Sequence, residues 1–534
     1  MSIEDALREW SKIPDVVVLG EKDASLRFGL NTIGAQRRIK GALSAQSVSQ
    51  VQEIVAIANT YIAPLYPISG GHNWGYGSSL PAVNDCVILD LSQMRRIVEL
   101  NKELACVTVE PGVTQRQLYE YIQKHNLDFM VPTSGAGPNG SLIGNALEKG
   151  YGITPYEDHF GAILNLKAVL PDGEIYHSAI SEFGGHRSDA IFKWKLGPYL
   201  EGLFAQGNMG IVVQATIALA PKPQDVTQFL MFVDDKHFED AVTAVGAIKQ
   251  RFGSMLGGVN LMNRRRLLSM VESNHEWLGE ETVTEVHIRE MAKKHMIPDW
   301  VVMGGVYCPH EITSGITKVI KKEFGRSAKH SVFLGRRKIN LAKKLLKFLP
   351  IPQIINTVKS VDQALSILEG VPSEVAIPLA YLKNHKTSPT RDNLSPDADG
   401  CGLIWYSPLI PIDASLVRDY TQEITRICLA KGIEPLITLT TISERCFDST
   451  IPILFDLNDK DECVRAQECY RSLLDLSREM GVFPYRVDVE TMRELFDSAE
   501  GKGSCFTIIQ KIKDAIDPNH IISPGRYSKF VPYE

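Results

Sequence analysis

The sequence lacks the features that mark secreted and membrane proteins. Its N-terminus, MSIEDALREWSKIPDVV, carries acidic residues where a secretory signal has a basic region, and no apolar core follows them. No apolar run approaches the ~20 residues that a membrane-spanning helix needs. We therefore expect a cytoplasmic protein.

Cysteine pairs and an excess of charge are lacking too. The nine cysteines are scattered, with no CxxC spacing, which predicts reduced thiols and neither disulfides nor a metal site. The 57 Lys+Arg against 63 Asp+Glu give a net charge of -6, without the basic excess that nucleic-acid binding requires. With 44% hydrophobic and 22% charged residues in a chain of 534, the composition is that of a folded protein of two to four domains.

Glycine is the residue that stands out, because many of the 41 glycines cluster before residue 211. PISGGHNWGYGSS (67–79) holds four of them, and SGAGPNGSLIGNALEKGYG (134–152) forms a second cluster. Such loops expose backbone N–H groups that can surround a pyrophosphate. The first of these loops is not followed by GK[ST] and is not a GxGxxG that opens a helix. The two clusters predict a large dinucleotide held by backbone at both ends; the alternative is a pair of ordinary glycine-rich turns.

The pattern of short segments predicts two regions of different kinds. Residues 44–61 read as a helix with a serine cap, and APLYPIS, CVILDLS and ACVTVEPG read as strands. APKPQDV (220–226) indicates a domain boundary. From about 226 to 495, strands alternate with longer amphipathic helices, which predicts a second α+β region. The C-terminal stretch predicts a helix that Asp517 and Pro518 end, then a short strand and a Pro-Gly turn.

One basic segment, RRKINLAKKLLKFLP (336–350), carries six Lys and Arg residues. Charge runs of this kind are commonly solvated, and we expect no membrane contact. The alternative is a helix that lies on a membrane surface.

Several segments in order resemble the FAD-binding domain of the vanillyl-alcohol oxidase/p-cresol methylhydroxylase (PCMH) flavoprotein family. They are PISGGHNWGYG, VILDLSQMRRIVEL, VEPGVTQRQLYEYI, IGNALEKGYGITPYEDHF, GPYLEGLFAQGNMGIV and AIDPNHIISPGR. The resemblance implies an α+β, two-domain PCMH-type fold. It implies an FAD-binding domain over 1–221, a substrate (cap) domain over 222–499, and a segment over 500–534 that returns to the first domain.

The resemblance also implies FAD as the cofactor, held largely by the glycine loops. The cofactor-binding residues that it indicates are Ser69, Gly70, Gly71, His72, Asn73, Gly75, Gly77, Pro132, Ser134, Gly135, Gly140, Ser141, Gly144, Asn145, Gly152, Asn208, Gly210, Ile211 and Arg526.

For the substrate, the resemblance implies a phenol whose oxyanion is held by Tyr76, Tyr485 and Arg486. The chemistry suits these residue types, since arginine stays charged and tyrosine hydroxyls donate hydrogen bonds. The alternative is that Arg486 pairs with Asp488 or Glu490 and the tyrosines only pack.

Asp158, in GYGITPYEDHF, corresponds to the family's carboxylate beside flavin N5. It is the candidate catalytic base. A turn aspartate is the alternative, and the neighbouring Glu157 or His159 could be the matching residue.

The flavin linkage departs from the resembling family. Leu403, in CGLIWYSPLIP, falls where the vanillyl-alcohol oxidase branch has its flavin-bound histidine. The loop sequence SGGH is similar to the berberine-bridge-enzyme and sugar-oxidase branches, in which the loop histidine bonds the flavin. We predict a covalent 8α-histidyl bond through His72. The alternatives are non-covalent FAD, with His72 donating to phosphate, or a bond to Cys401.

A second departure is TTISERCFDST (440–450), where Cys446 and Phe447 replace a histidine pair that the family commonly has. We expect a larger and more apolar pocket there. The predicted function is an FAD-dependent oxidase of para-substituted phenols that acts through a quinone methide, with O2 as acceptor, in a possible homodimer. Alternatives are a cytochrome-coupled dehydrogenase, a biosynthetic oxidase of a secondary metabolite (ring closure, or alcohol or amine dehydrogenation), or a binding protein on a degenerate flavoprotein fold.

Overall fold

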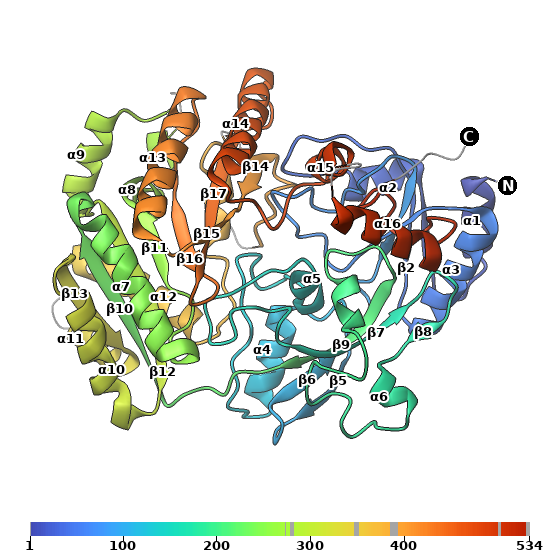
Figure 1. Cartoon of the computed structure of the whole chain (residues 1–534), viewed down its shortest axis with the longest axis horizontal. Coiled ribbons are helices and arrows are strands. Elements are labelled where there is room, and N and C mark those ends of the chain that lie inside the picture. Colours follow the sequence, from blue (N-terminus) through green and yellow to red (C-terminus); the bar gives the residue numbers. More distant parts are fainter. Residues whose placement is uncertain are drawn as a thin grey trace.

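Two regions lie side by side in the computed structural model, which describes residues 2–272, 274–277, 282–346, 352–384, 393–499 and 503–529. In Figure 1 the N-terminal region is blue and teal, and the central region runs from green to orange. The dark red C-terminal helices lie against the blue part (Figure 1). The fold is α+β, as the sequence predicts.

The N-terminal region contains two sheets. The first has the order β1-β2-β4-β3, with β2, β4 and β3 parallel, and the second has the antiparallel order β5-β6-β9-β7-β8. The strands are β1 Val17–Gly20, β2 Ile39–Ser44, β3 Leu65–Ile68, β4 Cys86–Asp90, β5 Ile97–Asn101, β6 Cys106–Val109, β7 Ile163–Val169, β8 Ile175–Tyr176 and β9 Ile211–Ala218. The α-helices are α1 Ile3–Trp10, α2 Glu21–Phe28, α3 Val48–Tyr61, α4 Gln115–Lys124, α5 Leu142–Leu147 and α6 Ala179–Glu182.

Helix α3 illustrates how local sequence sets an element's start. The Ser47 side chain accepts from the backbone N–H of Gln50, and the Gln50 side chain accepts from the Ser47 backbone in return. This capping box satisfies donors that the first helical turn leaves free. The predicted serine cap is present as Ser47, but the helix begins at Val48 and not at residue 44, because Ser44 is the last residue of β2.

The central region is built on one antiparallel sheet of eight strands, in the order β13-β10-β12-β11-β16-β17-β14, with β15 also paired to β17. The strands are β10 Asp225–Val233, β11 Asn260–Asn263, β12 Trp300–Cys308, β13 Ala328–Gly335, β14 Cys401–Tyr406, β15 Leu409–Pro411, β16 Thr438–Thr441 and β17 Cys446–Asp456. The α-helices are α7 Phe238–Phe252, α8 Arg264–Leu268, α9 Glu285–His295, α10 His310–Glu323, α11 Arg336–Leu346, α12 Pro352–Leu368, α13 Ala414–Ala430 and α14 Lys460–Met480.

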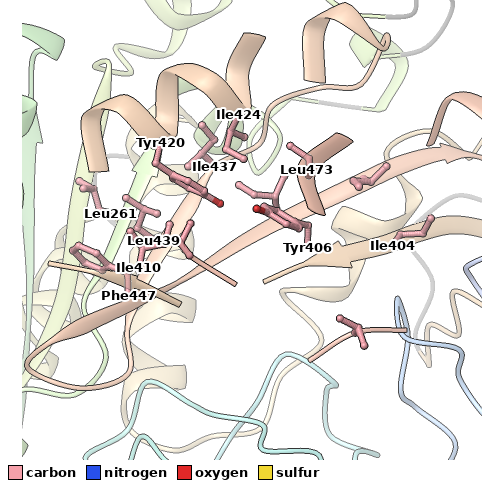
Figure 2. Packing of buried hydrophobic residues seen from close by; sticks show 14 of the residues in the cluster. Leu261, Ile404, Tyr406, Ile410, Tyr420, Ile424, Ile437, Leu439, Phe447 and Leu473 are labelled. Atoms are coloured by element: carbon pink, nitrogen blue, oxygen red, sulfur yellow. The ribbon is translucent and has the colours of Figure 1, made fainter. Parts of the chain in front are cut away.

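Strand β17 has one face in the core and one face toward the N-terminal region. Figure 2 shows Phe447 packed in the cluster that also holds Tyr420 of α13 and Leu473 of α14. Because successive strand residues point to opposite faces, Asp448 and Thr450 point away from that cluster.

The C-terminal segment returns to the first sheet. Helices α15 (Thr491–Ala499) and α16 (Ser504–Ile516) follow α14, and Asp517 and Pro518 end α16. Ile522 forms a parallel bridge with Leu65, and Leu65 N donates to Ile521 O at 2.7 Å. Both isoleucines are completely buried in the core of the first sheet. Residues far apart in the sequence therefore share one core.

Residues 336–346 of the basic segment form α11, and acidic residues of α12 and of the turn after it pair with two of its basic side chains. Arg336 pairs with Asp362 and with Glu369, and Lys343 pairs with Asp362 at 2.6 Å. The side chains of Leu345 and Leu346 and the whole of 347–350 lie outside the described residues. Within the described parts of the chain, no helix combines the length and the apolar character that a membrane crossing needs.

Candidate functional site

The two glycine clusters lie against each other. A Cβ atom added at Gly144 would lie 3.1 Å from Ser69 Oγ, and one added at Gly70 would lie 3.9 Å from Asn139 O. Gln115 of α4 fastens the second cluster, since its Nε2 donates to Ser134 Oγ at 2.9 Å and its Oε1 accepts from Ser134 N at 3.2 Å. Residues about sixty positions apart thus form one surface of backbone.

Strand β14 of the central region rests directly on the first glycine loop. Gly75 has φ +77°, and a Cβ there would lie 2.2 Å from the ring of Trp405. Trp405 N donates to Gly75 O at 3.2 Å. Glycine is required at this position both by the left-handed backbone and by the close approach of the ring.

Several buried polar atoms around these loops have no hydrogen-bond partner among the described residues. They are His72 Nδ1, Trp74 Nε1, Ser78 Oγ, Thr133 Oγ1 and His159 Nε2. An unpaired buried polar atom costs free energy, so such a group of atoms indicates a polar ligand. Together with the glycine surface, these atoms fit the polar edges and pyrophosphate of FAD.

The His72 ring is largely buried and uncharged. Its ring stacks on Trp74, with centroids 4.9 Å apart and planes 16° apart. Burial lowers the pKa of His72, against a smaller opposing effect of Asp397. The imidazole is therefore neutral near pH 7, with a free nitrogen lone pair.

Other residues predicted to bind the cofactor have structural partners. Ser141 caps α5 by accepting from Gly144 N at 2.9 Å. Asn145 Oδ1 lies 2.5 Å from His159 Nδ1, and a Cβ at Gly152 would lie 2.8 Å from His159 Nε2. These contacts hold the second loop in place next to the predicted cofactor surface.

Asn208, Ile211 and Arg526 lie at the junction with the C-terminal segment. Asn208 Nδ2 donates to Ser528 Oγ at 2.6 Å, and the Ile211 side chain is in the core of the first sheet. Arg526 is buried, pairs with Glu148 and donates to Tyr66 Oη at 2.9 Å. Direct contact of these three side chains with the cofactor stays a prediction. The remaining residues predicted to bind FAD in the two glycine-rich loops, or just before the second one, are Gly71, Asn73, Gly77, Pro132, Gly135 and Gly140. Gly210 lies directly before β9, where an added Cβ would be 3.0 Å from Val169 O of β7.

The structure brings Tyr76 and Arg486 together. The Arg486 guanidinium lies 4.1 Å from the centre of the Tyr76 ring, and its Nη2 donates to Asn73 Oδ1 at 2.7 Å. The Tyr76 hydroxyl lies 3.0 Å from Ser407 Oγ, which follows β14. Burial raises the pKa of Tyr76, so its hydroxyl stays protonated and can donate.

The alternative pairing of Arg486 with Asp488 or Glu490 is wrong. Glu490 pairs with Arg37 at 2.5 Å. Asp488 accepts from the backbone N–H groups of Glu490 and Thr491 at the start of α15. The guanidinium of Arg486 is therefore available to the side of the site where Tyr76 lies.

Tyr485 and Asp448 complete this cluster, which we call the tyrosine-arginine cluster (Tyr76, Tyr485, Arg486 and Asp448). Burial and the nearby Asp448 raise the pKa of Tyr485. Asp448 is 1% exposed, its Oδ2 accepts from Thr450 Oγ1 at 3.2 Å, and its Oδ1 has no partner among the described residues. Burial raises the pKa of Asp448 to about 6.

Asp158 lies apart from the hydrogen bonds of the tyrosine-arginine cluster. Its side chain is exposed, and its Oδ1 accepts from Gly161 N at 2.8 Å, as a turn aspartate does. The neighbouring Glu157 is buried and pairs with Lys249 of α7 at 2.5 Å. A catalytic role for Asp158 stays a prediction without support from this geometry.

Sequence reasoning missed Asp448 and misplaced Phe447. The Phe447 ring is fully buried in the core cluster, near Ile410 and Leu439 (Figure 2), so it does not lie on the face of β17 that carries Asp448. The larger and more apolar pocket stays a prediction. The alternation of residue types in FDSTIPILF could have shown the position of Asp448. Phe447, Ile451 and Ile453 lie on the core face of the strand, so Asp448 lies on the opposite face.

Glu148 was missed as well. It pairs with Arg526, and its Oε2 lies 3.8 Å from Arg486 Nη2. The carboxylate thus links the C-terminal segment to the tyrosine-arginine cluster through two arginines. Among the residues that the structure describes, no cluster of His, Cys, Asp and Glu side chains could hold a metal ion.

Comparison with known proteins agrees with this architecture. The family model of the FAD binding domain matches residues 39–179. Over 505 residues the chain is 30% identical to 1'-carboxy-chondrochloren decarboxylase of Chondromyces crocatus, covering 93% of this chain and 92% of the relative. It is 28% identical over 492 residues to the 4-cresol dehydrogenase [hydroxylating] flavoprotein subunit of Pseudomonas putida, covering 91% and 87%.

Two solved structures share the fold over nearly the whole chain. The crystal structure of p-cresol methylhydroxylase with substrate bound has a TM-score of 0.85 at 24% identity, covering 98% of this chain and 96% of that one. The 4-ethylphenol oxidase of Gulosibacter chungangensis, in its isoeugenol complex, has a TM-score of 0.87 at 23% identity, covering 98% and 97%. The glycine surface, the two-region architecture and the near full-length similarity lead to one conclusion: the chain belongs to the vanillyl-alcohol oxidase/p-cresol methylhydroxylase family of FAD-dependent oxidoreductases.

Proposed function

We propose that the protein oxidises a para-substituted phenol at its benzylic carbon. The observation that carries this proposal is the buried pairing of Arg486 with Tyr76, next to Tyr485. A cation and two hydroxyl donors at one end of a buried site suit an oxyanion. Bound FAD would supply the acceptor for the hydride that leaves the benzylic carbon.

The residues of the tyrosine-arginine cluster have separate tasks in this proposal. Arg486 and the two tyrosine hydroxyls hold the phenolate, whose electrons assist the departure of the hydride. Asn73 accepts a hydrogen bond from Arg486, which fixes the direction of the guanidinium. Burial of the cluster excludes water, and in a water-free site these interactions are stronger than in solution.

The test is anaerobic mixing of the FAD-loaded protein with a panel of 4-alkylphenols, followed at the flavin absorption band. We expect bleaching by at least one phenol and recovery of colour when air is admitted, since O2 is the acceptor that we propose. Absence of bleaching by every phenol contradicts the substrate class. Bleaching without recovery in air contradicts O2 and favours a cytochrome or another acceptor.

We further propose that FAD is attached covalently through His72. The neutral ring with a free Nδ1, stacked on Trp74, supports this role. Acid precipitation of the protein should leave the yellow colour in the pellet, and precipitation of the His72→Ala variant should release it. Release of all flavin from the wild-type protein contradicts the linkage and favours non-covalent FAD.

A second candidate activity, oxidative decarboxylation, is supported by the similarity to a decarboxylase over nearly the whole chain. If the carbon next to the benzylic carbon bears a carboxylate, loss of hydride gives a quinone methide. The C–C bond to the carboxylate then breaks, CO2 leaves, and the electron pair restores the phenolate and forms a vinyl group. A 3-(4-hydroxyphenyl)propanoate should then yield CO2 and the vinylphenol, whereas the first candidate yields hydroxylated product and no CO2.

Homodimer formation stays a prediction from the commonness of such assemblies. Sedimentation of the FAD-loaded protein over a range of concentrations would measure it, and a single species of monomer mass would contradict it.

A further inference from the structure

Asp448 is a buried carboxyl group that the proposed chemistry has not yet used. Leu409 of β15 pairs with Asp448 in the sheet, and Leu409 N donates to Phe483 O at 3.1 Å. Pro408 forms a bridge with Pro484, directly before Tyr485. The short strand β15 therefore ties the backbone at Asp448 to the segment that carries Tyr485 and Arg486.

Charged and titratable groups reach Asp448 from several elements. Arg486 and Tyr485 come from the segment after α14, Tyr76 comes from the glycine loop, and Tyr151 comes from the loop after α5. On the core side of the sheet, the charge of Asp448 contributes to the raised pKa of Tyr420 of α13. The Tyr151 hydroxyl lies 3.0 Å from Thr450 Oγ1, beside the Asp448 carboxylate.

One oxygen of this carboxyl group has no partner. Oδ2 accepts from Thr450, and the Tyr151 hydroxyl lies close enough to the carboxyl group to lower its pKa. Oδ1 is buried, and no described residue donates a hydrogen bond to it. A buried acceptor without a donor is costly, so this position calls for a ligand that brings a donor. A neutral phenol brings one in its O–H group.

We propose that Asp448 Oδ1 takes up the phenolic proton when the substrate binds, an inference that rests on the proposed phenol oxidation. The O–H bond of the phenol breaks and an Oδ1–H bond forms. The negative charge moves from Asp448 to the phenolate, beside Arg486, so the net charge of the site does not change. When the quinone methide oxygen later regains its electron pair, Asp448 returns the proton to it.

The other members of the cluster are poor bases for this step. Burial raises the pKa of both Tyr76 and Tyr485, which keeps them as donors. Arg486 stays protonated at every working pH. A simple phenol has a pKa of ~10 and is neutral at pH 7, so a base inside the closed site is needed to generate the phenolate there.

A binding experiment tests proton uptake without turnover. 4-Fluorophenol has no benzylic carbon and cannot be oxidised. Binding to the FAD-loaded wild-type protein at pH 7.5, in weak buffer with a pH indicator, should give the absorption of a phenolate without release of protons. Asp448→Asn should bind the neutral phenol or release about one proton per phenolate bound. Release of one proton by the wild-type protein contradicts the proposal, because the proton has then gone to solvent.

A kinetic experiment tests the same step during reduction. At pH 7, Asp448→Asn should slow flavin reduction by 4-ethylphenol about 100-fold, as loss of a general base does. Ring-fluorinated 4-ethylphenols ionise more readily, so the loss should shrink as the phenol becomes more acidic and as the pH approaches the phenol's own pKa. An equal loss for every phenol at every pH contradicts proton transfer and leaves Asp448 a positioning residue.

Two further variants serve as controls. Asp488→Asn changes another buried carboxyl group, outside the tyrosine-arginine cluster, and should leave the pH profile of reduction unchanged. Thr450→Val removes the donor to Asp448 Oδ2, raises the pKa of Asp448 and should move the acid limb of the profile to higher pH. If the acid limb of the pH profile does not move in Thr450→Val, the proposal is contradicted, even if Asp448→Asn does not fold. If no phenol bleaches the wild-type protein, phenol oxidation itself fails, which is a separate outcome.

Discussion

The two regions contribute different chemical groups to the site. Apart from the side chains of His72 and Tyr76, the N-terminal region presents mainly backbone, in two glycine clusters where an added Cβ at Gly75 would collide with a neighbour. The central region and the segment after α14 present charged and hydroxyl side chains, above all Asp448 and Arg486, held by strands and strand bridges. One side suits a large cofactor of fixed chemistry, and the other suits a substrate that must be recognised and activated.

This difference predicts opposite sensitivities. A backbone surface tolerates changes of distant side chains but not an added methyl group at a contact glycine. A side-chain site keeps its fold when a functional group is removed but loses its chemistry. Substitutions on the two sides should therefore separate folding and cofactor retention from reaction rate.

The largest expected effect is that of Arg486→Ala on flavin reduction. In the proposed reaction Arg486 holds the phenolate, so its removal should lower the reduction rate by about 100- to 1000-fold, as loss of an oxyanion-stabilising donor does. Arg486→Lys, which keeps the charge but changes the guanidinium geometry, should lose less. Anaerobic stopped-flow measurement on samples of equal FAD content checks both. A loss below tenfold in the alanine variant would contradict the phenolate role.

The backbone side is tested by comparing two glycines that both have positive φ. Gly75 has φ +77° and a ring 2.2 Å from its added Cβ, whereas Gly173 has φ +87° and no atom within 4 Å. Gly173→Ala should cost about 1 kcal/mol of unfolding free energy from backbone strain alone. Gly75→Ala should cost about 3 kcal/mol, with loss of FAD, because Trp405 must also move. Equal costs in denaturant unfolding would mean that the contact between the regions is adaptable.

The same contrast explains what the sequence could predict. The glycine clusters and the Tyr485-Arg486 pair are contiguous strings, so their roles could be proposed from local pattern and family resemblance. Asp448 could not be found this way, because its place in the site depends on its pairing with Leu409 and Thr440. Glu148 could not be found this way either, because its place in the site depends on its ion pair with Arg526, 378 positions away. The alternation of apolar and polar residues in β17 does predict that Phe447 and Asp448 lie on opposite faces of the strand.

Asp448 should also make stability depend on pH. Burial raises its pKa from 3.8 to about 6, so the fold disfavours the ionised form. The stability that this group contributes is present in full below about pH 4 and is lost as pH rises through 6. Asp448→Asn should match the wild-type protein in unfolding free energy near pH 4 and exceed it by about 2–3 kcal/mol at pH 8. A variant that is less stable than wild type at pH 8 would contradict this sign.

The smallest effect is expected on α11, whose charges lie outside both parts of the site. Lys343 is exposed and pairs only with Asp362 in the described structure, so Lys343→Ala should change the unfolding free energy by less than about 0.5 kcal/mol. Arg336 bridges Asp362 and Glu369 and is less exposed, so Arg336→Ala should cost more. Neither variant should alter FAD retention or flavin reduction. If the wild-type protein bound anionic vesicles and Lys343→Ala did not, this helix would serve a membrane surface, and the central region would have a task outside the proposed site.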